Sequence, residues 1–490
     1  MTRLLPLGAF AAAIFSLAAG AIVWLATHGF TGAEALALRG EAFAARDGAL
    51  GMREIVLAFP PVPHLAVMAL GFLPEIPAMS TPALLCALVV AVTGAAWFDS
   101  LVVSGFSVRA AAGLTALLLL NPLYLRLALT SPADALLVLA ASVLASAAFR
   151  LRAQSRVADL ISLSFCLAFV ALCHPLGVAL ACALAPWLVF VVQPAFARES
   201  LAGACLTILF PFLLAMAGAG ALALIFGGDA RGFATFATSP ELTGEFGLAA
   251  AWRARNTPAI IAASLGMLAA APVLFAVLLS TRRRLPRHLP TLALIASAPL
   301  AASLAGFFGV VREPLTIAAP LLGFAAATLT IWPPEPARAA RIAALLMVGA
   351  GAGAAMIALA PSRESGQFLQ ALRGDVVEST VAADIAVGEY LRDHEGVLID
   401  AVSAPGVLAG RGSAAGLYLP TQAQFEAARL SKRAAARYLA VRRATGELAA
   451  GDAVHAIFPD LHGKGMADYS RVYDNGVWRV YKRAPRAARM

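Results

Sequence analysis

Charged residues are scarce in this chain. Asp, Glu, Lys and Arg make up 13% of its 490 residues, whereas 60% of the residues are apolar and the mean hydropathy is +0.81. Soluble domains carry about 25% charged residues. The composition therefore excludes a soluble enzyme and also excludes a disordered chain. It predicts a polytopic membrane protein.

Cysteine and patterned charge are also scarce, and this excludes other classes. None of the five cysteines has the C-x-x-C spacing of a metal or redox site. Histidines and acidic residues show no metal-site spacing either, so we predict no tightly bound structural metal and no cofactor, and a divalent metal bound with the substrate stays open. The net charge is +9, but no basic run is interleaved with aromatic residues. A nucleic-acid groove needs such a run, and we expect no nucleic-acid partner.

Long apolar segments fill residues 1–360, and the composition changes after Pro361. The tail, 361–490, contains all three lysines and lacks the roughly 20 consecutive apolar residues that cross a bilayer. We therefore predict an all-α membrane domain over 1–360, with a long first outer loop at 28–80, and a small soluble α/β domain over 361–490. About eleven spans are expected, at roughly 5–27, 81–104, 109–129, 133–149, 158–173, 175–193, 202–226, 257–280, 289–307, 314–332 and 341–360.

The placement of arginine predicts the orientation. With the N-terminus inside, the inner loops hold twelve cations against four anions, and the outer loops hold eight cations against ten anions. Cytoplasmic loops carry the excess of Lys and Arg, so this orientation is favoured. An odd number of spans then places the tail outside, which in a bacterium means the periplasmic side of the inner membrane.

The tail has the pattern of an α/β domain. Asn475-Gly476 stands between two alternating runs and predicts a β-hairpin. Apolar residues at helical spacing predict a helix between Val381 and Leu391. Strands are expected at 396–401, 416–419 and 438–441, with an Ala-rich helix at 422–436. From position alone, we expect this domain to cover the active-site face or to help bind the acceptor.

The first outer loop is the most informative segment. Glu34, Leu38 and Glu41 share one face of a helix. The apolar side chains that accompany them suggest that this helix lies on the bilayer surface, with its carboxylates just outside the membrane. These apolar residues are Leu36, Leu38, Phe43 and Leu50.

Residues in this loop and around the predicted outer end of a later span carry a family resemblance. They are Glu34, Arg39, Phe59-Pro60-Pro61 and Ser131-Pro132-Ala133-Asp134. With about eleven spans and an outer soluble tail, the chain resembles the GT-C glycosyltransferases that use polyprenyl-phosphate sugars. That group includes protein mannosyltransferases, aminoarabinose transferases and rhizobial galacturonosyltransferases. Its members often carry an Asp-Glu pair after the first span, and here the pair is Ala33-Glu34.

The resemblance implies transfer of a monosaccharide from a polyprenyl-phosphate donor to an extracytoplasmic glycan, lipid or protein. An acceptor hydroxyl is a poor nucleophile until a general base takes its proton, and Glu34 is the expected base. Phosphate already leaves well, so one carboxylate suffices for direct displacement with inversion. A cation must hold the phosphate, and arginine does so through bidentate hydrogen bonds. The expected donor- or acceptor-binding residues are Arg39, Arg53, Glu54, His64, Asp134 and Arg312.

Several acidic residues have an alternative interpretation. Glu34 is either the base or a solvated loop carboxylate, and Glu41 and Glu54 are the alternative bases. Asp134 is either a site residue or a charge that complements a helix dipole.

The basic candidates have alternatives as well. Arg126 either belongs to the site or extends its charged head to the membrane interface. Arg312 either binds phosphate or pairs only with Glu313. His64 and His174 lie near the predicted outer face, where a structural, hydrogen-bonded histidine is the simpler explanation.

Three other functions stay open at this point. A non-catalytic membrane scaffold with a partner-binding periplasmic domain is compatible with Ala33 in place of the paired Asp. A transporter of a lipid-linked sugar explains the spans, but it leaves the outer domain unexplained. A ligase or polymerase of surface polysaccharide shares the substrate class and has a different fold.

Overall fold

A computed structural model describes most of the chain, and its contacts divide the protein into two compact units. The membrane unit comprises Met1–His28, Ala58–His64 and Ala83–Asp375, and the α/β unit comprises Gly29–Leu57, Leu65–Pro82 and Val376–Met490. The described residues are 4–73, 79–154, 156–228, 265–280, 285–308, 314–332, 334–359, 363–377, 381–401, 404–432, 436–443 and 452–484.

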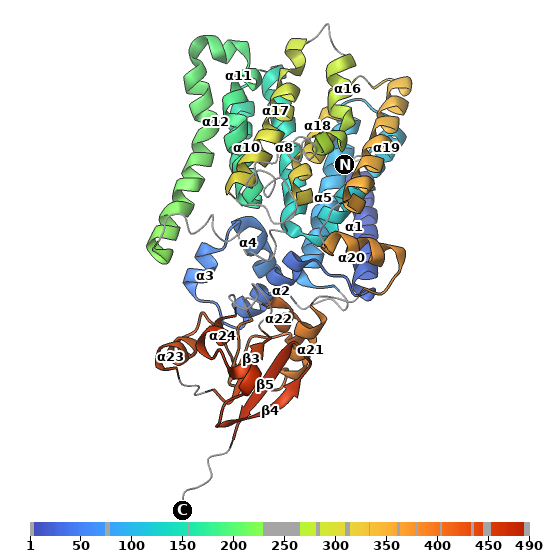
Figure 1. Ribbon diagram of the computed structural model, residues 1–490. Coiled ribbons are helices and arrows are strands. Elements are labelled where there is room, and N and C mark those ends of the chain that lie inside the picture. Colours follow the sequence, from blue (N-terminus) through green and yellow to red (C-terminus); the bar gives the residue numbers. More distant parts are fainter. Residues whose placement is uncertain are drawn as a thin grey trace, which may run out of the picture. The chain divides into compact units, whose positions relative to one another are not determined.

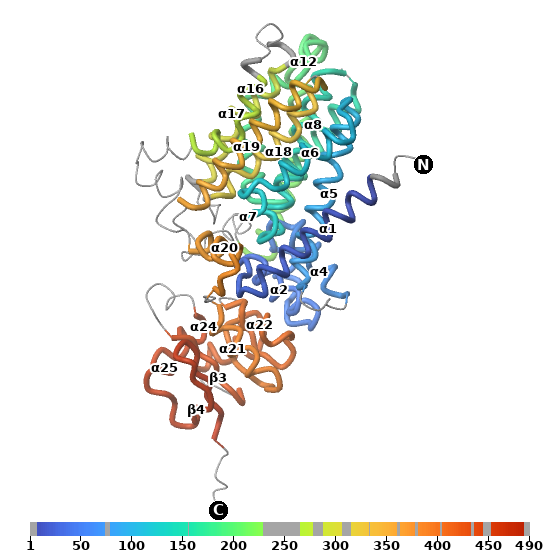
Figure 2. Tube along the Cα trace, turned by 90° about the vertical axis from the view of Figure 1, so that its right-hand side faces the viewer, coloured from blue at the N-terminus to red at the C-terminus, as the bar shows by residue number. Residues whose placement is uncertain are grey.

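The described part of the membrane unit is helical throughout. Its long helices run alongside one another, as Figures 1 and 2 show. Helix α8 packs against α9 and α18, and α10 packs against α17. In chain order the elements are α1 (Leu4–Thr27), α5 (Thr81–Val103), α6 (Val108–Leu119), α7 (Pro122–Thr130), α8 (Pro132–Gln154), α9 (Val157–Cys173), α10 (Pro175–Leu184), the 3-10 turn η1 (Ala185–Trp187), α11 (Leu188–Val191), α12 (Pro194–Leu222), the π turn η2 (Ala223–Gly227), α16 (Pro272–Ser280), α17 (Leu285–Phe308), the 3-10 turn η5 (Pro314–Ala318), α18 (Ala319–Leu329), α19 (Pro336–Leu359) and α20 (Arg363–Arg373).

The described residues contain six helices that are long and apolar enough to cross a membrane, or seven if the α6–α7 pair, bent by 69°, is one span. The chain is therefore a multi-pass membrane protein. The predicted count of about eleven is not confirmed. The predicted spans at 158–173 and 175–193 form helices Val157–Cys173 and Pro175–Val191, which are shorter than a typical span. The predicted span at 257–280 lies partly outside the described residues.

The α/β unit contains a five-stranded sheet of order β2-β1-β3-β5-β4 (Figure 1). Strands β2, β1 and β3 are parallel, whereas β5 is antiparallel to both β3 and β4. The predicted hairpin is confirmed, since β4 and β5 pair across Asn475-Gly476. The elements are α2 (Ala33–Arg46), α3 (Met52–Leu57), α21 (Ala382–Tyr390), β1 (Val397–Leu398), α22 (Pro405–Arg411), β2 (Leu417–Tyr418), α23 (Ala423–Ser431), β3 (Tyr438–Arg442), α24 (Ala453–Ile457), α25 (Leu461–Lys464), β4 (Tyr469–Asp474) and β5 (Trp478–Arg483), and α4 (Pro61–Leu70) contributes residues to both units.

Alternate residues of the strands face two separate hydrophobic cores, as the two-residue period of a strand requires. Ala440 belongs to one core, with α21 and α22, and Leu439 belongs to the other, with α23. Ala44 and Ala49 of the first loop lie in the same core as Val407 of α22.

Most of the first loop, Gly29–Leu57 and Leu65–Pro82, is therefore part of the α/β unit, whereas Ala58–His64 belongs to the membrane unit. This division differs from the predicted boundary at residue 360, which grouped loop 28–80 with the membrane domain. The physical reason is the packing of α2 against α22, a contact between residues far apart in sequence.

Candidate functional site

Two breaks between helices gather polar side chains in the membrane unit. Ser131 separates α7 from α8, and His174 separates α9 from α10. Both residues have extended backbone angles, φ −135° and ψ 115° for Ser131 and φ −157° and ψ 144° for His174. Each residue precedes a proline, which disfavours the helical conformation of the residue before it. One helix therefore ends before Ser131 or His174, and the following proline is the first residue of the next helix.

The side chains at these breaks form a buried cluster. His174 Nδ1 accepts a hydrogen bond of 2.9 Å from the backbone N–H of Leu176, so a neutral His174 carries its proton on Nε2. That Nε2 lies 3.4 Å from Asp134 Oδ1. The hydroxyl of Thr316 donates to Asp134 Oδ2 at 3.3 Å. Asp134, His174 and Thr316 are 5%, 8% and 3% exposed, respectively.

Arg126 is a buried cation on α7, the helix that precedes Asp134. It is 2% exposed. Its Nη1 donates to Thr130 Oγ1 at 2.5 Å, and its Nη2 lies 3.5 Å from Glu364 Oε1 of α20. The guanidinium carbon lies 5.7 Å from the centre of the Phe368 ring. Arg126 is thus held in place from both α7 and α20.

Helix α20 relates this cluster to the end of α1. Trp24, near the C-terminal end of α1, donates its indole N–H to Ala371 O of α20 at 3.1 Å. Arg126 contacts the same helix. The C-terminal end of α1 and the Arg126 side chain therefore lie at one end of the membrane unit.

Basic residues mark the opposite end of the unit. Arg150 Nε lies 3.8 Å from Asp159 Oδ1, and Arg152 Nη1 donates to Val192 O at 2.7 Å. Asp134 and Arg150 are 16 residues apart on α8, which corresponds to about 24 Å along a helix. If the arginine-rich end is cytoplasmic, as predicted, the Asp134 cluster lies at the outer end.

The membrane unit thus buries a carboxylate and a guanidinium on two successive helices, α8 and α7. A carboxylate accepts hydrogen bonds from sugar hydroxyls. A guanidinium donates to phosphate oxygens in a fixed fork. Asp134 and Arg126 supply these two groups from adjacent helices, within a structure that excludes most water.

Helix α2 carries two of the predicted site residues. Glu34 lies in its first turn and is half-buried, as is Arg39, whose guanidinium carbon lies 5.3 Å from the centre of the Phe43 ring. Leu36 and Leu38 are 4% and 3% exposed. The expectation that this apolar face lies on the bilayer is wrong, because protein atoms already cover it.

The remaining predicted residues are dispersed. On α3, Arg53 is exposed and Glu54 is half-buried. His64 of α4 is half-buried and belongs to the membrane unit, and it follows the cis Phe59–Pro60 peptide bond. Arg312 lies outside the described residues.

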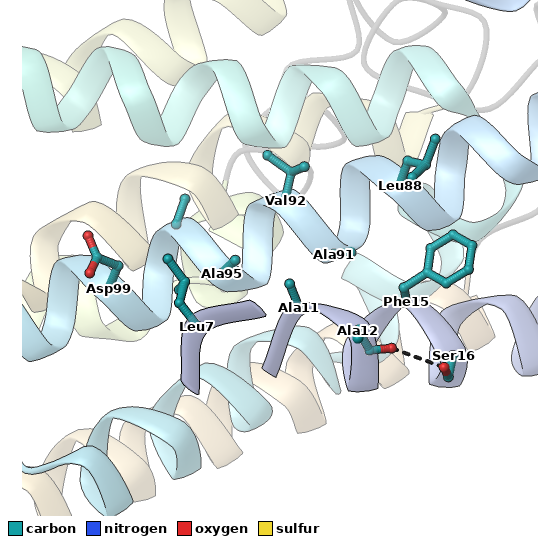
Figure 3. A pocket seen from close by; sticks show the side chains of 11 residues that line it. Leu7, Ala11, Ala12, Phe15, Ser16, Leu88, Ala91, Val92, Ala95 and Asp99 are labelled. Atoms are coloured by element: carbon teal, nitrogen blue, oxygen red, sulfur yellow. Dashed lines mark hydrogen bonds between the residues drawn. The ribbon is translucent and has the colours of Figure 1, made fainter. Parts of the chain in front are cut away.

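An apolar groove of about 620 Å³ lies between α1 and α5 in the membrane unit. Figure 3 shows Asp99 near Leu7 at one end of the groove, and Phe15 and Ser16 at the other. The Ser16 hydroxyl donates to Ala12 O. Among the described residues that line this groove, Asp99 is the one with an ionisable side chain.

Residues 452–464 also contain two histidines and two aspartates, the side-chain types that bind metal ions. Asp452 Oδ1 accepts hydrogen bonds from the backbone N–H groups of Val454 and His455 and thereby caps α24. Burial raises the pKa of Asp452. Across the part of the chain that the structure describes, no group of three or more His, Cys, Asp or Glu side chains is arranged to hold a metal ion.

The sequence indicated part of the Asp134 cluster. Asp134 is a predicted site residue, and His174 is predicted to lie near the outer face as a hydrogen-bonded histidine. The pairing of the two residues is not predicted, since they are 40 residues apart. Thr316 and Glu364 carried no sequence signal, because a single threonine or glutamate near a helix end is common.

Comparison with protein-family models gives no match, and comparison with curated proteins gives none. The chain is similar to a solved structure, the cryo-EM structure of arabinofuranosyltransferase AftD from mycobacteria, with a TM-score of 0.40 and 17% sequence identity. The alignment covers 96% of this chain and 40% of that one, so the chain spans well under half of that enzyme's length.

Proposed function

We propose that this protein is a membrane glycosyltransferase of the bacterial inner membrane. It transfers a monosaccharide from a polyprenyl-phosphate donor to an extracytoplasmic glycan, lipid or protein acceptor. Glu34 is the general base, and the α/β unit lies on the periplasmic side.

The position of Glu34 carries the proposal. Its carboxylate is half-buried in the first turn of an ordered helix, ten residues after Trp24 at the end of α1. A carboxylate held by a packed helix is a better-positioned base than one on a solvated loop.

The transfer is a single displacement. The acceptor oxygen attacks the anomeric carbon, and its bond to that carbon forms as the bond from carbon to phosphate oxygen breaks. The electron pair of the breaking bond leaves with polyprenyl phosphate. The proton of the acceptor hydroxyl passes to the Glu34 carboxylate and then to water. The configuration at the anomeric carbon is inverted.

Substrate binding is assigned to the polar and basic candidates. Asp134 is the best supported, because it is buried in a cluster with His174 and Thr316. It accepts hydrogen bonds from sugar hydroxyls. The other proposed binding residues are Arg39, Arg53, Glu54, His64 and Arg312.

The test uses Glu34→Gln in a strain that lacks the native gene, with Glu41→Gln as the matched control. Glu41 lies on the same helix and is also half-buried. Gln keeps the size of the side chain and removes its basicity. Loss of a general base lowers the rate by about 10²- to 10⁴-fold, so the Glu34→Gln strain should accumulate a polyprenyl-phosphate sugar. Mass spectrometry of lipid and glycan extracts should also show a surface glycan, lipid or protein that lacks one sugar.

The outcomes separate the competing functions. If Glu41→Gln is deficient and Glu34→Gln is not, the base is assigned to the wrong residue. If the deletion strain and the wild type give identical extracts, the glycosyltransferase proposal fails. The scaffold function would then lead, and the partner of the α/β unit would be the next object of study.

A further inference from the structure

The C-terminal end of α2 is fastened to the loop that follows α22. Asp47 Oδ2 accepts hydrogen bonds of 2.7 Å from the Ser413 hydroxyl and 2.7 Å from the Ala414 backbone N–H. Arg46 donates to Gly412 O at 3.1 Å. We call these five residues the α2 clasp. All of them belong to the α/β unit.

The loop side of the clasp is itself fixed. The Arg411 side chain, 6% exposed, donates to three backbone carbonyls. The acceptors are Leu391 O at 2.9 Å, His394 O at 3.0 Å and Ser413 O at 2.8 Å. Arg411 therefore connects Ser413 to the C-terminal end of α21. The loop that binds Asp47 is in this way attached to both α21 and α22.

Helices α21 and α22 pack closely against each other. A Cβ added at Gly406 would lie 2.8 Å from Asp384 Cβ, and a Cβ added at Gly388 would lie 2.9 Å from the Arg411 backbone N. A side chain at either glycine would collide with the neighbouring helix, so the two helices approach each other closely at these positions. Helix α2 rests on this layer, since a Cβ added at Gly40 would lie 3.4 Å from Leu408 Cβ.

We propose that Asp47 is a positioning residue. The C-terminal domain, by which we mean Val376–Met490 of the α/β unit, serves as the support that holds α2, and with it Glu34, in the geometry needed for transfer. This proposal rests on the proposed function of Glu34. It assigns the C-terminal domain the task of orienting the base, in addition to any role in covering the site or binding the acceptor.

The geometry of a helix gives the expected effect. Glu34 is six residues from Gly40, about 9 Å along the axis, so a tilt of about 10° about Gly40 displaces Glu34 by about 1.6 Å. A misplacement of about 1 Å at a reacting group can lower the rate about 100-fold. The clasp opposes such a tilt from the other end of the same helix.

The charge of Asp47 strengthens the clasp. Burial raises the pKa of this carboxyl. The hydrogen bonds from Ser413 and the Ala414 N–H, together with Arg46, lower the pKa by more than burial raises it, so it lies below its ordinary value. The carboxylate is therefore ionised at neutral pH. Hydrogen bonds to an ionised acceptor are stronger than those between neutral groups.

The experiment compares the full-length wild type, Asp47→Ala and Asp47→Ala combined with Gly40→Cys and Leu408→Cys. The two new cysteines would stand at close to the Cβ separation of a disulfide. Each purified protein is added to membranes of the deletion strain, which hold the accumulated lipid-linked sugar and its acceptor. Asp460→Ala is the control, since the Asp460 side chain is 74% exposed and forms a surface ion pair with Lys464.

We expect Asp47→Ala to lower kcat by roughly 10- to 100-fold, with little change in KM for the donor. The oxidised triple variant should recover kcat to within a few-fold of the wild type, and reduction with dithiothreitol should remove the recovery. Ser413→Ala keeps the Ala414 N–H and should give a smaller loss, which provides a reading if Asp47→Ala does not fold. Asp460→Ala should match the wild type.

Three results overturn the proposal: wild-type kcat in both Asp47→Ala and Ser413→Ala, failure of the disulfide to form, or a formed disulfide that leaves kcat low. A failure of Glu34 as the base is distinguishable. In that case Glu34→Gln stays active while Asp47→Ala is slow and is rescued by the disulfide, so the support of α2 stands.

Discussion

His174 links two helix breaks, and its substitution separates the two interactions it makes. In His174→Ala, α10 loses the cap on the Leu176 N–H and Asp134 loses the imidazole 3.4 Å away. Loss of a helix cap costs about 1 kcal/mol, and removal of a partner from a buried polar group costs about 1–3 kcal/mol. The free energy of unfolding should fall by the sum, about 2–4 kcal/mol. In His174→Asn the amide keeps the cap, so the loss should be about 1 kcal/mol smaller.

The assay uses the cysteines of the membrane unit. Cys86 and Cys173 are both fully buried, so a thiol-reactive dye labels them when the unit unfolds. Denaturant titration of the full-length protein in detergent, followed by dye labelling, gives the free energy of unfolding by linear extrapolation. Wild-type stability of His174→Ala would refute the reasoning about the buried pair. Equal losses in His174→Asn and His174→Ala would refute the reasoning about the cap.

Two further predictions concern the close packing of helices and the clasp. Gly323→Ala places a Cβ 2.6 Å from Val138 O of α8 and should lower the free energy of unfolding by about 1–3 kcal/mol; Gly351→Ala, which meets nothing within 4 Å, should leave it unchanged or raise it, and the dye assay checks both. Asp47→Asn should destabilise the protein at neutral pH, because the lowered pKa of Asp47 gives a stabilisation that is present above its ordinary value of 3.8 and is lost as the pH falls through the folded pKa. Thermal unfolding followed by near-UV circular dichroism should therefore show a gap between the wild type and Asp47→Asn at pH 5–7 that closes below about pH 3.8, and a gap independent of pH would contradict this.

Local patterns in the sequence predicted the local structure of the C-terminal domain. The Asn475-Gly476 hairpin and the strand at 438–441 depend on neighbouring residues, and both were predicted. The order of the strands was not predicted, because parallel pairing of β2, β1 and β3 depends on contacts between distant segments. The burial of Leu36 and Leu38 was missed for the same reason, since the helix that packs against α2 lies in the C-terminal part of the chain.

The candidate site was predictable only where a single residue type carries the chemistry. Glu34 and Asp134 stand out as candidates because carboxylates are rare in a chain with 13% charged residues, and their roles stay predictions. The partnership of Asp134 with His174 and Thr316 depends on how α8, α10 and η5 meet. The residue pattern within one segment cannot predict contacts between three separate segments.

The α2 clasp has a consequence for the synthesis of the protein. Arg46 and Gly412, which bond in the finished structure, are separated by 366 residues, and at about 5–20 residues per second the ribosome needs roughly 20–70 s to make them. During that interval α2 has left the ribosome, and its support does not yet exist. The strands of the sheet follow all the membrane spans in the sequence, so the spans are made before the sheet can form. The α/β unit is therefore completed only after every earlier segment of the chain, membrane spans included, has been made.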